Sequence, residues 1–294
     1  MKAARRFVVL MLAGVALCTT SGQTSPSNPE TLIPTHFLLT AKTKKEFSTD
    51  LTPAELRVTE NGNPVTIQEI KKLDDARMRY CILFDTSNST RKDFQLMQRA
   101  ALEMLQQAVH HDTDSGWLVL FNTGLAQSEE TKDTIAIGNA ITAARPSGGT
   151  SFYDAVTQCA HRMARGPEEP LLKVMFIFSD GDDNQSHMTS QEAMQAAIEA
   201  GVRVYAVYAE PVPPQESAHV LKHMTAETGG QVFVLSGNKD TAVFAAQLDK
   251  ELHNLLAVTY ARKPSQDNEV RHIDIKCERK GVRIYAPRSI YLHN

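Results

Sequence analysis

The sequence has no excess of basic residues and few aromatic ones. Its 31 Lys and Arg residues are outnumbered by 34 Asp and Glu, and only 6% of the residues are aromatic. Nucleic acids are bound through clustered positive charge, and single strands are also bound through aromatic stacking. These absences argue against a nucleic-acid-binding protein.

Cysteine is also scarce. Of 4 cysteines, Cys81, Cys159 and Cys277 lie beyond the N-terminal apolar segment, and none belongs to a CxxC pair or to a paired Cys/His zinc motif. No zinc site is therefore predicted, and buried free thiols are expected. One disulfide between two of the three would suit an oxidising compartment, but the spacing does not say which two would pair.

Sequence motifs of common enzymes are missing. The chain contains no GxxxxGK[ST] phosphate loop, no GxSxG nucleophile elbow and no HExxH zinc motif. A strand that ends in Asp85 resembles haloacid-dehalogenase phosphatases, but their second Asp is replaced by Ser87, so the acid–base partner is missing. The sequence predicts a protein that is not an enzyme and has no small-molecule substrate.

Apart from the N-terminus, the chain has no apolar run long enough to cross a membrane. Residues 1–22 combine the basic "MKAARR", the apolar "FVVLMLAGVALC" and small polar residues, which is the layout of a secretory signal peptide. The apolar run is short for a membrane span. We therefore expect export to the periplasm, the cell surface or the medium. The cleavage site and any lipidation at Cys18 stay open. Residues 23–34 are expected to form a linker.

Residues 77–256 alternate buried strands with amphipathic helices. "RYCILFD", "GWLVLFN", "LLKVMFIF" and "VRVYAVYA" are apolar strands, and "RKDFQLMQRAALEMLQQAVHH" carries one apolar helical stripe. Thr189 and Glu192 have capping-box spacing at the start of another helix. This alternation predicts an α/β fold with a doubly wound, mostly parallel sheet and helices on both faces.

Both flanks of this region are strand-like. Residues 35–76 contain Asn61-Gly62 between two alternating runs, a strong hairpin signal, and residues 257–294 alternate apolar and polar positions. We expect the two flanks to pack together as a small β extension beside the α/β domain.

Oxygen-bearing side chains follow the predicted strands at three places. Asp85, Ser87 and Ser89 alternate after the first strand, Thr150 lies in "SGGTS", and Asp180 follows the strand that ends at "FIF". The carboxyl ends of parallel strands share one edge of a sheet, where ligands gather. Hard oxygen ligands with one or two carboxylates suit Mg²⁺, with Mn²⁺ or Ca²⁺ as alternatives.

Helix capping is the structural alternative for the same hydroxyls. Ser87, Ser89 and Thr90 precede a predicted helix that starts near Arg91, and a side-chain oxygen at such a position accepts a backbone N–H. The two roles are compatible, so capping does not exclude metal binding.

Two further groups of polar residues are expected to stabilise helix ends. Thr150 or Ser151 is expected to cap the next helix with Asp154 at its third position. His110 and His111 are expected to close a helix, whose end favours cations, and no metal role is predicted for them.

The residues Asp85, Ser87, Ser89, Thr150 and Asp180 resemble the DxSxS…T…D metal-ion-dependent adhesion site of von Willebrand factor type A domains. The resemblance covers about residues 77–256, with Ser179 where the family commonly has Thr. The flanks, including "LTPAELRVTENGNPVTI" and "RHIDIKCERKGVRIYAPRSIYL", resemble secreted relatives known chiefly from Acidobacteria. The resemblance implies a Rossmann-like fold and a divalent cation held by the five residues.

The function that this resemblance implies is recognition of a protein partner. A partner's Asp or Glu would complete the shell of the cation, as in cell adhesion, and no nucleic acid is expected to bind. Two alternatives stay open: a metal-dependent hydrolase that uses the same cluster, and a structural subunit of an envelope assembly that needs no metal. The partner's identity and the oligomeric state are left undetermined.

Overall fold

The computed structural model describes residues 32–73, 76–110, 112–165, 172–210, 215–264 and 268–292. These residues belong to one unit, Leu32–Asn294. The predicted signal peptide, residues 1–22, and the predicted linker up to residue 31 lie outside the described residues. Among the helices that are described, none has both the length and the apolar character needed to cross a bilayer.

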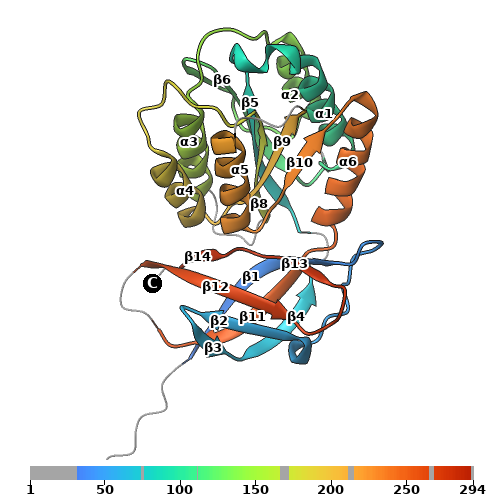
Figure 1. Cartoon of the computed structure of the whole chain (residues 1–294), viewed down its shortest axis with the longest axis vertical. Helices are drawn as coiled ribbons and strands as arrows, with labels where there is room; N and C mark the ends of the chain where they lie inside the picture. Colours follow the sequence, from blue (N-terminus) through green and yellow to red (C-terminus); the bar gives the residue numbers. More distant parts are fainter. Residues whose placement is uncertain are drawn as a thin grey trace, which may run out of the picture. The chain divides into compact units, whose positions relative to one another are not determined.

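A six-stranded sheet forms the centre of the α/β part (Figure 1). Its strand order is β10-β9-β8-β5-β6-β7, and the strands are parallel except β7, which pairs antiparallel with β6 at one edge. The predicted, mostly parallel sheet is therefore confirmed. The strands are β5 (Met78–Asp85), β6 (Ser115–Phe121), β7 (Leu125–Gln127), β8 (Leu172–Phe178), β9 (Arg203–Ala209) and β10 (Val232–Leu235).

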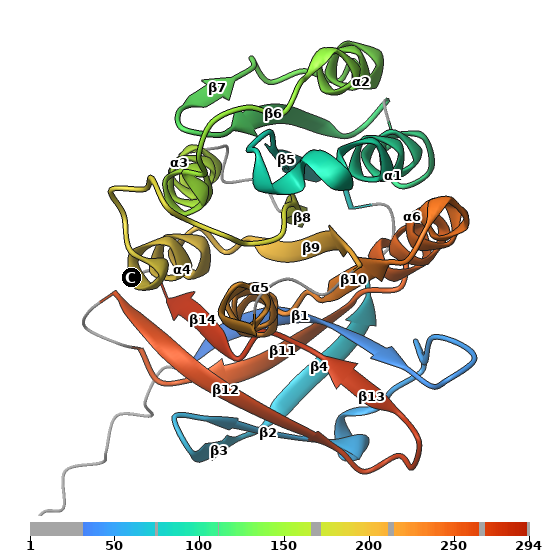
Figure 2. The same cartoon turned by 45° about the horizontal axis from the view of Figure 1, so that its top comes forward.

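Helices cover both faces of this sheet (Figure 2). Every residue of β5 is buried, and successive side chains enter opposite cores. Tyr80, Ile82 and Phe84 pack towards one set of helices, while Cys81 and Leu83 pack towards the other. The first set is α1 (Phe94–Gln107), α2 (Thr134–Ala143) and α6 (Asn238–Leu252), and the second is α3 (Phe152–Ala164), α4 (Ser190–Glu199) and α5 (Gln215–Thr228).

The described cysteines are not paired. Cys81 and Cys159 are buried in the core between the sheet and α3, Cys277 is half-buried, and all three are free. Burial raises the pKa of the Cys81 thiol, which keeps it in the unreactive neutral form.

The start of α4 agrees with the predicted capping box. Thr189 Oγ1 accepts the Glu192 backbone N–H at 3.2 Å, and Glu192 Oε2 accepts the Thr189 N–H at 2.8 Å. Both bonds satisfy donors that the first turn leaves without helical partners.

The alternative role of Ser87, Ser89 and Thr90 as helix caps is not observed. A short 3₁₀ turn, Ser89–Lys92, precedes α1, and neither the turn nor the helix has a side-chain cap. Thr90 instead donates its hydroxyl to Ser87 O at 3.0 Å. The serine hydroxyls are therefore left for other contacts.

The predicted cap of α3 is also replaced. The side chain of Ser151 donates to Thr123 O at 3.1 Å, so it does not accept from the helix. Asp183, which belongs to the loop after β8, accepts the Tyr153 N–H at 3.1 Å. Asp154 accepts backbone N–H groups from the same distant loop. The acceptors for the first N–H groups of α3 therefore come from a distant loop, where the sequence had predicted residues next to the helix.

Helix α1 ends before the histidines that were expected to close it. Its last residue is Gln107, and Asp114 Oδ2 accepts the His110 N–H at 2.8 Å beyond the helix end. This bond turns the chain towards β6, which is why His110 leaves the helix. His111 lies outside the described residues.

Strands from the two flanks form two further sheets, which confirms the predicted β extension (Figure 1). Their strand orders are β13-β1-β11-β4 and β14-β12-β2-β3. Asn61 and Gly62 turn from β2 into β3 with φ of 48° and 79°, as a two-residue hairpin turn requires. The strands are β1 (Ile33–Lys42), β2 (Leu56–Glu60), β3 (Asn63–Val65), β4 (Ile67–Lys72), β11 (Leu256–Arg262), β12 (Glu269–Cys277), β13 (Arg283–Tyr285) and β14 (Ser289–Leu292).

A buried arginine joins the α/β part to the β extension. Arg203, at the start of β9, donates to Leu38 O at 3.2 Å and to Tyr285 O at 3.3 Å. Its guanidinium lies 3.9 Å from the carboxylate of Glu251 in α6, and Lys42 lies 3.5 Å from the same carboxylate. Arg203 and Glu251 are 4% and 0% exposed, so this charge cluster is shielded from solvent.

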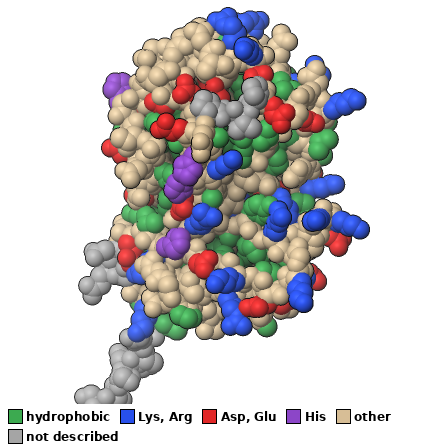
Figure 3. All heavy atoms as spheres, viewed as in Figure 1, with side chains coloured by type: hydrophobic (Ala, Val, Ile, Leu, Met, Phe, Trp, Pro, Cys, Tyr) green, Lys and Arg blue, Asp and Glu red, His purple; other side chains and the backbone are tan. Residues whose placement is uncertain are grey.

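The surface agrees with the absence of a basic excess. On the face drawn in Figure 3, basic side chains are interspersed with acidic ones and do not merge into one positive patch. Such a face offers no extended electrostatic footprint for a phosphate backbone.

Candidate metal centre

The chain turns sharply where β5 ends at Asp85. Thr86 donates both its backbone N–H and its hydroxyl to Phe121 O in β6, at 2.8 and 3.0 Å. These two bonds stop the strand and hold the following loop over the carboxyl edge of the sheet. Asp85 is 0% exposed there.

Both oxygens of Asp85 accept hydrogen bonds. Oδ1 accepts the Ser87 backbone N–H at 2.8 Å, and Oδ2 accepts the Ser179 hydroxyl at 2.6 Å. Burial raises the pKa of Asp85 from 3.8 to about 6, although the bonds from Ser179 and Ser87 act to lower it. No Lys, Arg or His among the described residues forms an ion pair with this carboxylate. A buried acid without a cationic partner is costly to ionise.

Ser87 and Ser89 bring their hydroxyls together. Their Oγ atoms lie 2.9 Å apart, with Ser87 buried and Ser89 exposed. The loop therefore presents two neutral oxygens side by side, one of them facing solvent.

The glycine turn before α3 is tied to this first loop. Ser147 donates its N–H to Thr86 O at 2.7 Å, and Asn88 donates its N–H to Gly148 O at 3.1 Å. Gly148 has φ of +76°, and a Cβ there would lie 2.5 Å from the Thr123 hydroxyl oxygen. A glycine is thus needed for the turn that delivers Thr150.

Thr150 is held by its backbone. Its N–H donates to Asn184 Oδ1 at 3.0 Å, and its carbonyl accepts the N–H groups of Asn184 and Gln185. The side chain is 1% exposed, and its hydroxyl makes no hydrogen bond within the described part of the chain. The Thr150 hydroxyl therefore has no hydrogen-bond partner that would compete with a cation.

Asp180 lies at the same edge, one residue beyond Ser179. Its Oδ1 accepts the Asp182 N–H at 3.1 Å, and the side chain is half-buried. Its negative charge is close enough to contribute to the raised pKa of Asp85. The Ser179 hydroxyl also accepts the Gly181 N–H at 3.0 Å, which fixes the turn after β8.

The predicted residues are thus brought together to different extents. Asp85, Ser87 and Ser89 are connected by hydrogen bonds within one loop, and Ser179 links Asp85 to the loop of Asp180. Thr150 reaches the group through backbone bonds between loops. Within the described residues, no side-chain hydrogen bond joins it to the other four.

Two supporting residues have roles that the sequence does not reveal. Asp183 accepts the Tyr153 N–H in the first turn of α3, and Asn184 accepts the Thr150 N–H. Both partners lie about 30 residues earlier in the sequence, so no local spacing signals these contacts.

The sequence of this region matches a known family model. The model, described as the von Willebrand factor type A domain, matches residues 81–255. That segment begins inside β5 and ends after α6. It therefore includes all three loops of the candidate centre. No curated protein matches the sequence.

Solved structures with similar folds include a mussel byssus protein and a bacterial pilus adhesin. The proximal thread matrix protein 1 of the mussel byssus, with a zinc-occupied metal-ion-dependent adhesion motif, has a TM-score of 0.50 and 19% identity, covering 65% of this chain and 50% of that one. The pilus adhesin SpaC of Lactobacillus rhamnosus GG has a TM-score of 0.51 and 9% identity, covering 80% and 47%. The chain spans about half the length of these proteins. Identities this low show a shared fold.

Proposed function

The chain belongs to the von Willebrand factor type A domain family, and from this we propose that it is an exported protein-binding module that works through a divalent cation. Asp85, Ser87, Ser89, Thr150 and Asp180 hold the cation, with Mg²⁺ the preferred ion. An Asp or Glu of the partner protein completes its coordination shell.

The separation of the two serine hydroxyls is the main support. Mg²⁺ binds oxygen at 2.0–2.1 Å in near-octahedral geometry, so adjacent ligand oxygens lie about 2.8–3.0 Å apart. The Oγ atoms of Ser87 and Ser89 are 2.9 Å apart. In the five-fold equatorial plane of Ca²⁺, ligands at about 2.4 Å also lie about 2.8 Å apart. The spacing is therefore that of two ligands on one divalent cation.

The charges of the other groups fit the same ion. Asp85 is buried without a cationic partner, and Asp180 adds a second carboxylate at the same edge. Two carboxylates balance a dication, while the hydroxyls of Ser87, Ser89 and Thr150 add no charge. When bound, the cation supplies an electrophilic position for an outside carboxylate.

The exposed rim supports recognition of a macromolecule. Ser89 is exposed and Asp180 is half-buried, so a partner's side chain can approach from solvent. The N-terminal pattern of residues 1–22 supports export, and the similarity in fold to a pilus adhesin is compatible with a place at the cell surface.

Calorimetric titration with Mg²⁺ tests the ligand set. We expect one binding event in the wild type that is lost in Ser87→Ala and Thr150→Ala. Ser147→Ala is the matched control, because this exposed serine lies on the same rim but outside the proposed set. Binding that is unchanged in Ser87→Ala and Thr150→Ala would contradict the proposed site.

Selection from a random peptide library tests the recognition step. Peptides retained in Mg²⁺ and released by EDTA are expected to contain an Asp or Glu whose change to Asn or Gln abolishes binding. Peptides that bind equally well in EDTA, or that need no acidic residue, would contradict metal-mediated recognition.

A further inference from the structure

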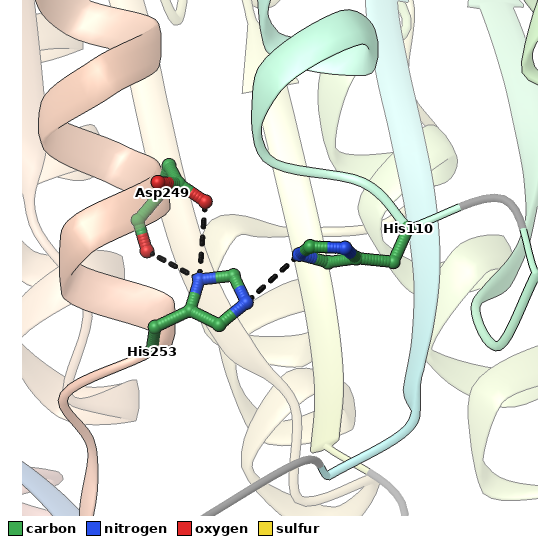
Figure 4. A group of neighbouring side chains, drawn as sticks. All are labelled: His110, Asp249 and His253. Atoms are coloured by element: carbon green, nitrogen blue, oxygen red, sulfur yellow. Dashed lines mark hydrogen bonds and ion pairs between the residues drawn. The ribbon is translucent and has the colours of Figure 1, made fainter.

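A second cluster of metal-ligand side chains lies away from the carboxyl edge of the sheet (Figure 4). It consists of His110, Asp249 and His253, whose ligand atoms all lie within 4.8 Å of one another. His110 follows α1 and precedes β6, and His253 directly follows α6. Because β5 and β6 are parallel, the start of β6 lies at the edge opposite to Asp85.

The contacts of His253 determine which of its nitrogens carries hydrogen. Its Nδ1 lies 2.8 Å from Asp249 O and 3.0 Å from Asp249 Oδ1. Both are acceptors, so Nδ1 must be the donor. In the neutral ring, Nε2 then has the free lone pair, which is the form that binds metals.

That lone pair points at a second imidazole. His253 Nε2 lies 2.8 Å from His110 Nε2, with the two ring planes at 78°. Two ring nitrogens that face each other either share one hydrogen or bind one cation between them. Tetrahedral zinc at 2.0–2.1 Å places adjacent nitrogens about 3.3 Å apart. Both histidines are exposed, so small side-chain rotations can open this separation.

We propose that His110 and His253 form a transition-metal site through their Nε2 atoms, with Zn²⁺ as the representative ion. Imidazole ligands select Zn²⁺, Cu²⁺ or Ni²⁺ over Mg²⁺ and Ca²⁺. Asp249 orients His253 through Nδ1, as carboxylates commonly do for metal-binding histidines. This site is independent of the one proposed for Mg²⁺ and differs from it in ligand chemistry.

The surroundings leave room for the remaining ligands. His110 and His253 line a cavity of about 370 Å³, together with the acidic residues Asp112 and Asp114 and the basic Lys72. The two carboxylates outweigh the one ammonium group, and water can occupy the other coordination positions of a cation.

A metal here would tie together the ends of two neighbouring helices. Ala108, just after α1, and Leu252, the last residue of α6, are buried in the same core. Only three residues separate Leu252 from β11 of the extension. The site would therefore hold the end of α6 where the chain crosses into the β extension.

Zinc calorimetry on the full chain, in an excess of Mg²⁺ that occupies the other site, tests this proposal. We expect one zinc-binding event that disappears in His110→Gln and in His253→Gln. Asp249→Asn is expected to keep the event with affinity reduced about 10- to 100-fold, as for other carboxylates that orient a metal-binding histidine. Cobalt titration should give a d–d absorption band that only the first two variants abolish.

Two controls separate this site from adventitious zinc binding. His219 and His223 form another exposed pair, on α5, with ring centroids 5.9 Å apart. His187 has a carboxylate partner, Asp154, at 3.0 Å but no second histidine. The variants His219→Gln/His223→Gln and His187→Gln are expected to retain the zinc event. Zinc binding that persists in His110→Gln and His253→Gln, or that is lost in a control variant, would overturn the proposal.

Discussion

Ser179 donates its hydroxyl hydrogen to Asp85 Oδ2 at 2.6 Å and thereby joins the carboxyl ends of β8 and β5. Both side chains are 0% exposed. The bond favours the ionised carboxylate, and it opposes the effect of burial on the pKa of Asp85. Ser179 is therefore a supporting residue of the proposed metal centre although it is not one of the five proposed ligands.

Replacing Ser179 should weaken Mg²⁺ binding. In Ser179→Ala the Asp85 carboxylate loses a donor, and we expect the Mg²⁺ affinity to fall about 10- to 100-fold, the usual effect of removing a partner of a metal ligand. Ser179→Thr keeps the hydroxyl and should bind within a few-fold of the wild type. Calorimetry on the two variants measures the difference, and equal affinities would contradict a role for this bond.

Asp85 should make the metal-free protein less stable as pH rises. Its pKa is about 6 in the folded chain against an ordinary value of 3.8. Between these values the folded state binds more protons than the unfolded state, so stability falls as pH rises through this window. A pKa difference of about two units corresponds to about 3 kcal/mol in the free energy of unfolding. In EDTA, Asp85→Asn should therefore be more stable than the wild type at pH 7.5, and this gain should shrink towards pH 4.

Denaturant titrations in EDTA and in Mg²⁺ measure this effect. Asp274→Asn, which changes an exposed carboxylate on β12, should not alter the free energy of unfolding in either buffer. In Mg²⁺ the ranking should reverse, because only the wild type gains binding energy. A wild type that is more stable than Asp85→Asn at pH 7.5 in EDTA would contradict the predicted cost of the buried charge.

Gly148 should be required for metal binding because its turn positions Thr150. Gly148→Ala adds a Cβ at φ +76°, 2.5 Å from Thr123 Oγ1, which accepts the Gly149 N–H. We expect loss of stability of about 1 kcal/mol or more from this backbone strain, and weaker Mg²⁺ binding because the loop shifts. Gly62→Ala is a matched control with φ +79° and nothing within 4 Å. It should lose stability but keep the Mg²⁺ affinity of the wild type, as calorimetry would show.

Arg203 should be a major source of stability at the junction with the β extension. Arg203→Met removes the guanidinium partner of Glu251, which is 0% exposed, and leaves Lys42 at 3.5 Å as the remaining cation. Because the buried charge keeps one partner, the loss of stability should lie below the roughly 3–5 kcal/mol of a fully unpaired one. Arg57 forms an ion pair with Glu278 at the surface, where the two side chains are 76% and 52% exposed. Arg57→Ala should therefore cost no more than about 1 kcal/mol in the same chemical denaturation experiment.

The strands and helices of the α/β part are evident in the sequence because their signals are local. The run from Met78 to Phe84 is apolar at every position except Arg79, and this is typical of a strand between two helical layers. Asn61-Gly62 and the Thr189–Glu192 pair are equally local, and both are confirmed. Strand β7, with three residues, is too short to produce a pattern.

The supporting contacts of the candidate centre are not evident in the sequence. Asp183 reaches the first turn of α3, and Asn184 reaches Thr150, across loops that only the folded sheet brings together. The helix cap predicted for Ser151 fails for the same reason, since its hydroxyl donates to Thr123 O, 28 residues earlier in the chain.

The order of apolar and polar residues along the chain was by itself enough to specify a parallel sheet, and to place Asp85 and Asp180 at the ends of its strands, because periodicity and strand ends are properties of neighbouring residues. Which distant groups touch was decided only by the tertiary structure. His110 and His253 are 143 residues apart in sequence and 2.8 Å apart in space. That proximity depends on how α1 and α6 pack against the same sheet, and packing of this kind leaves no trace in local spacing.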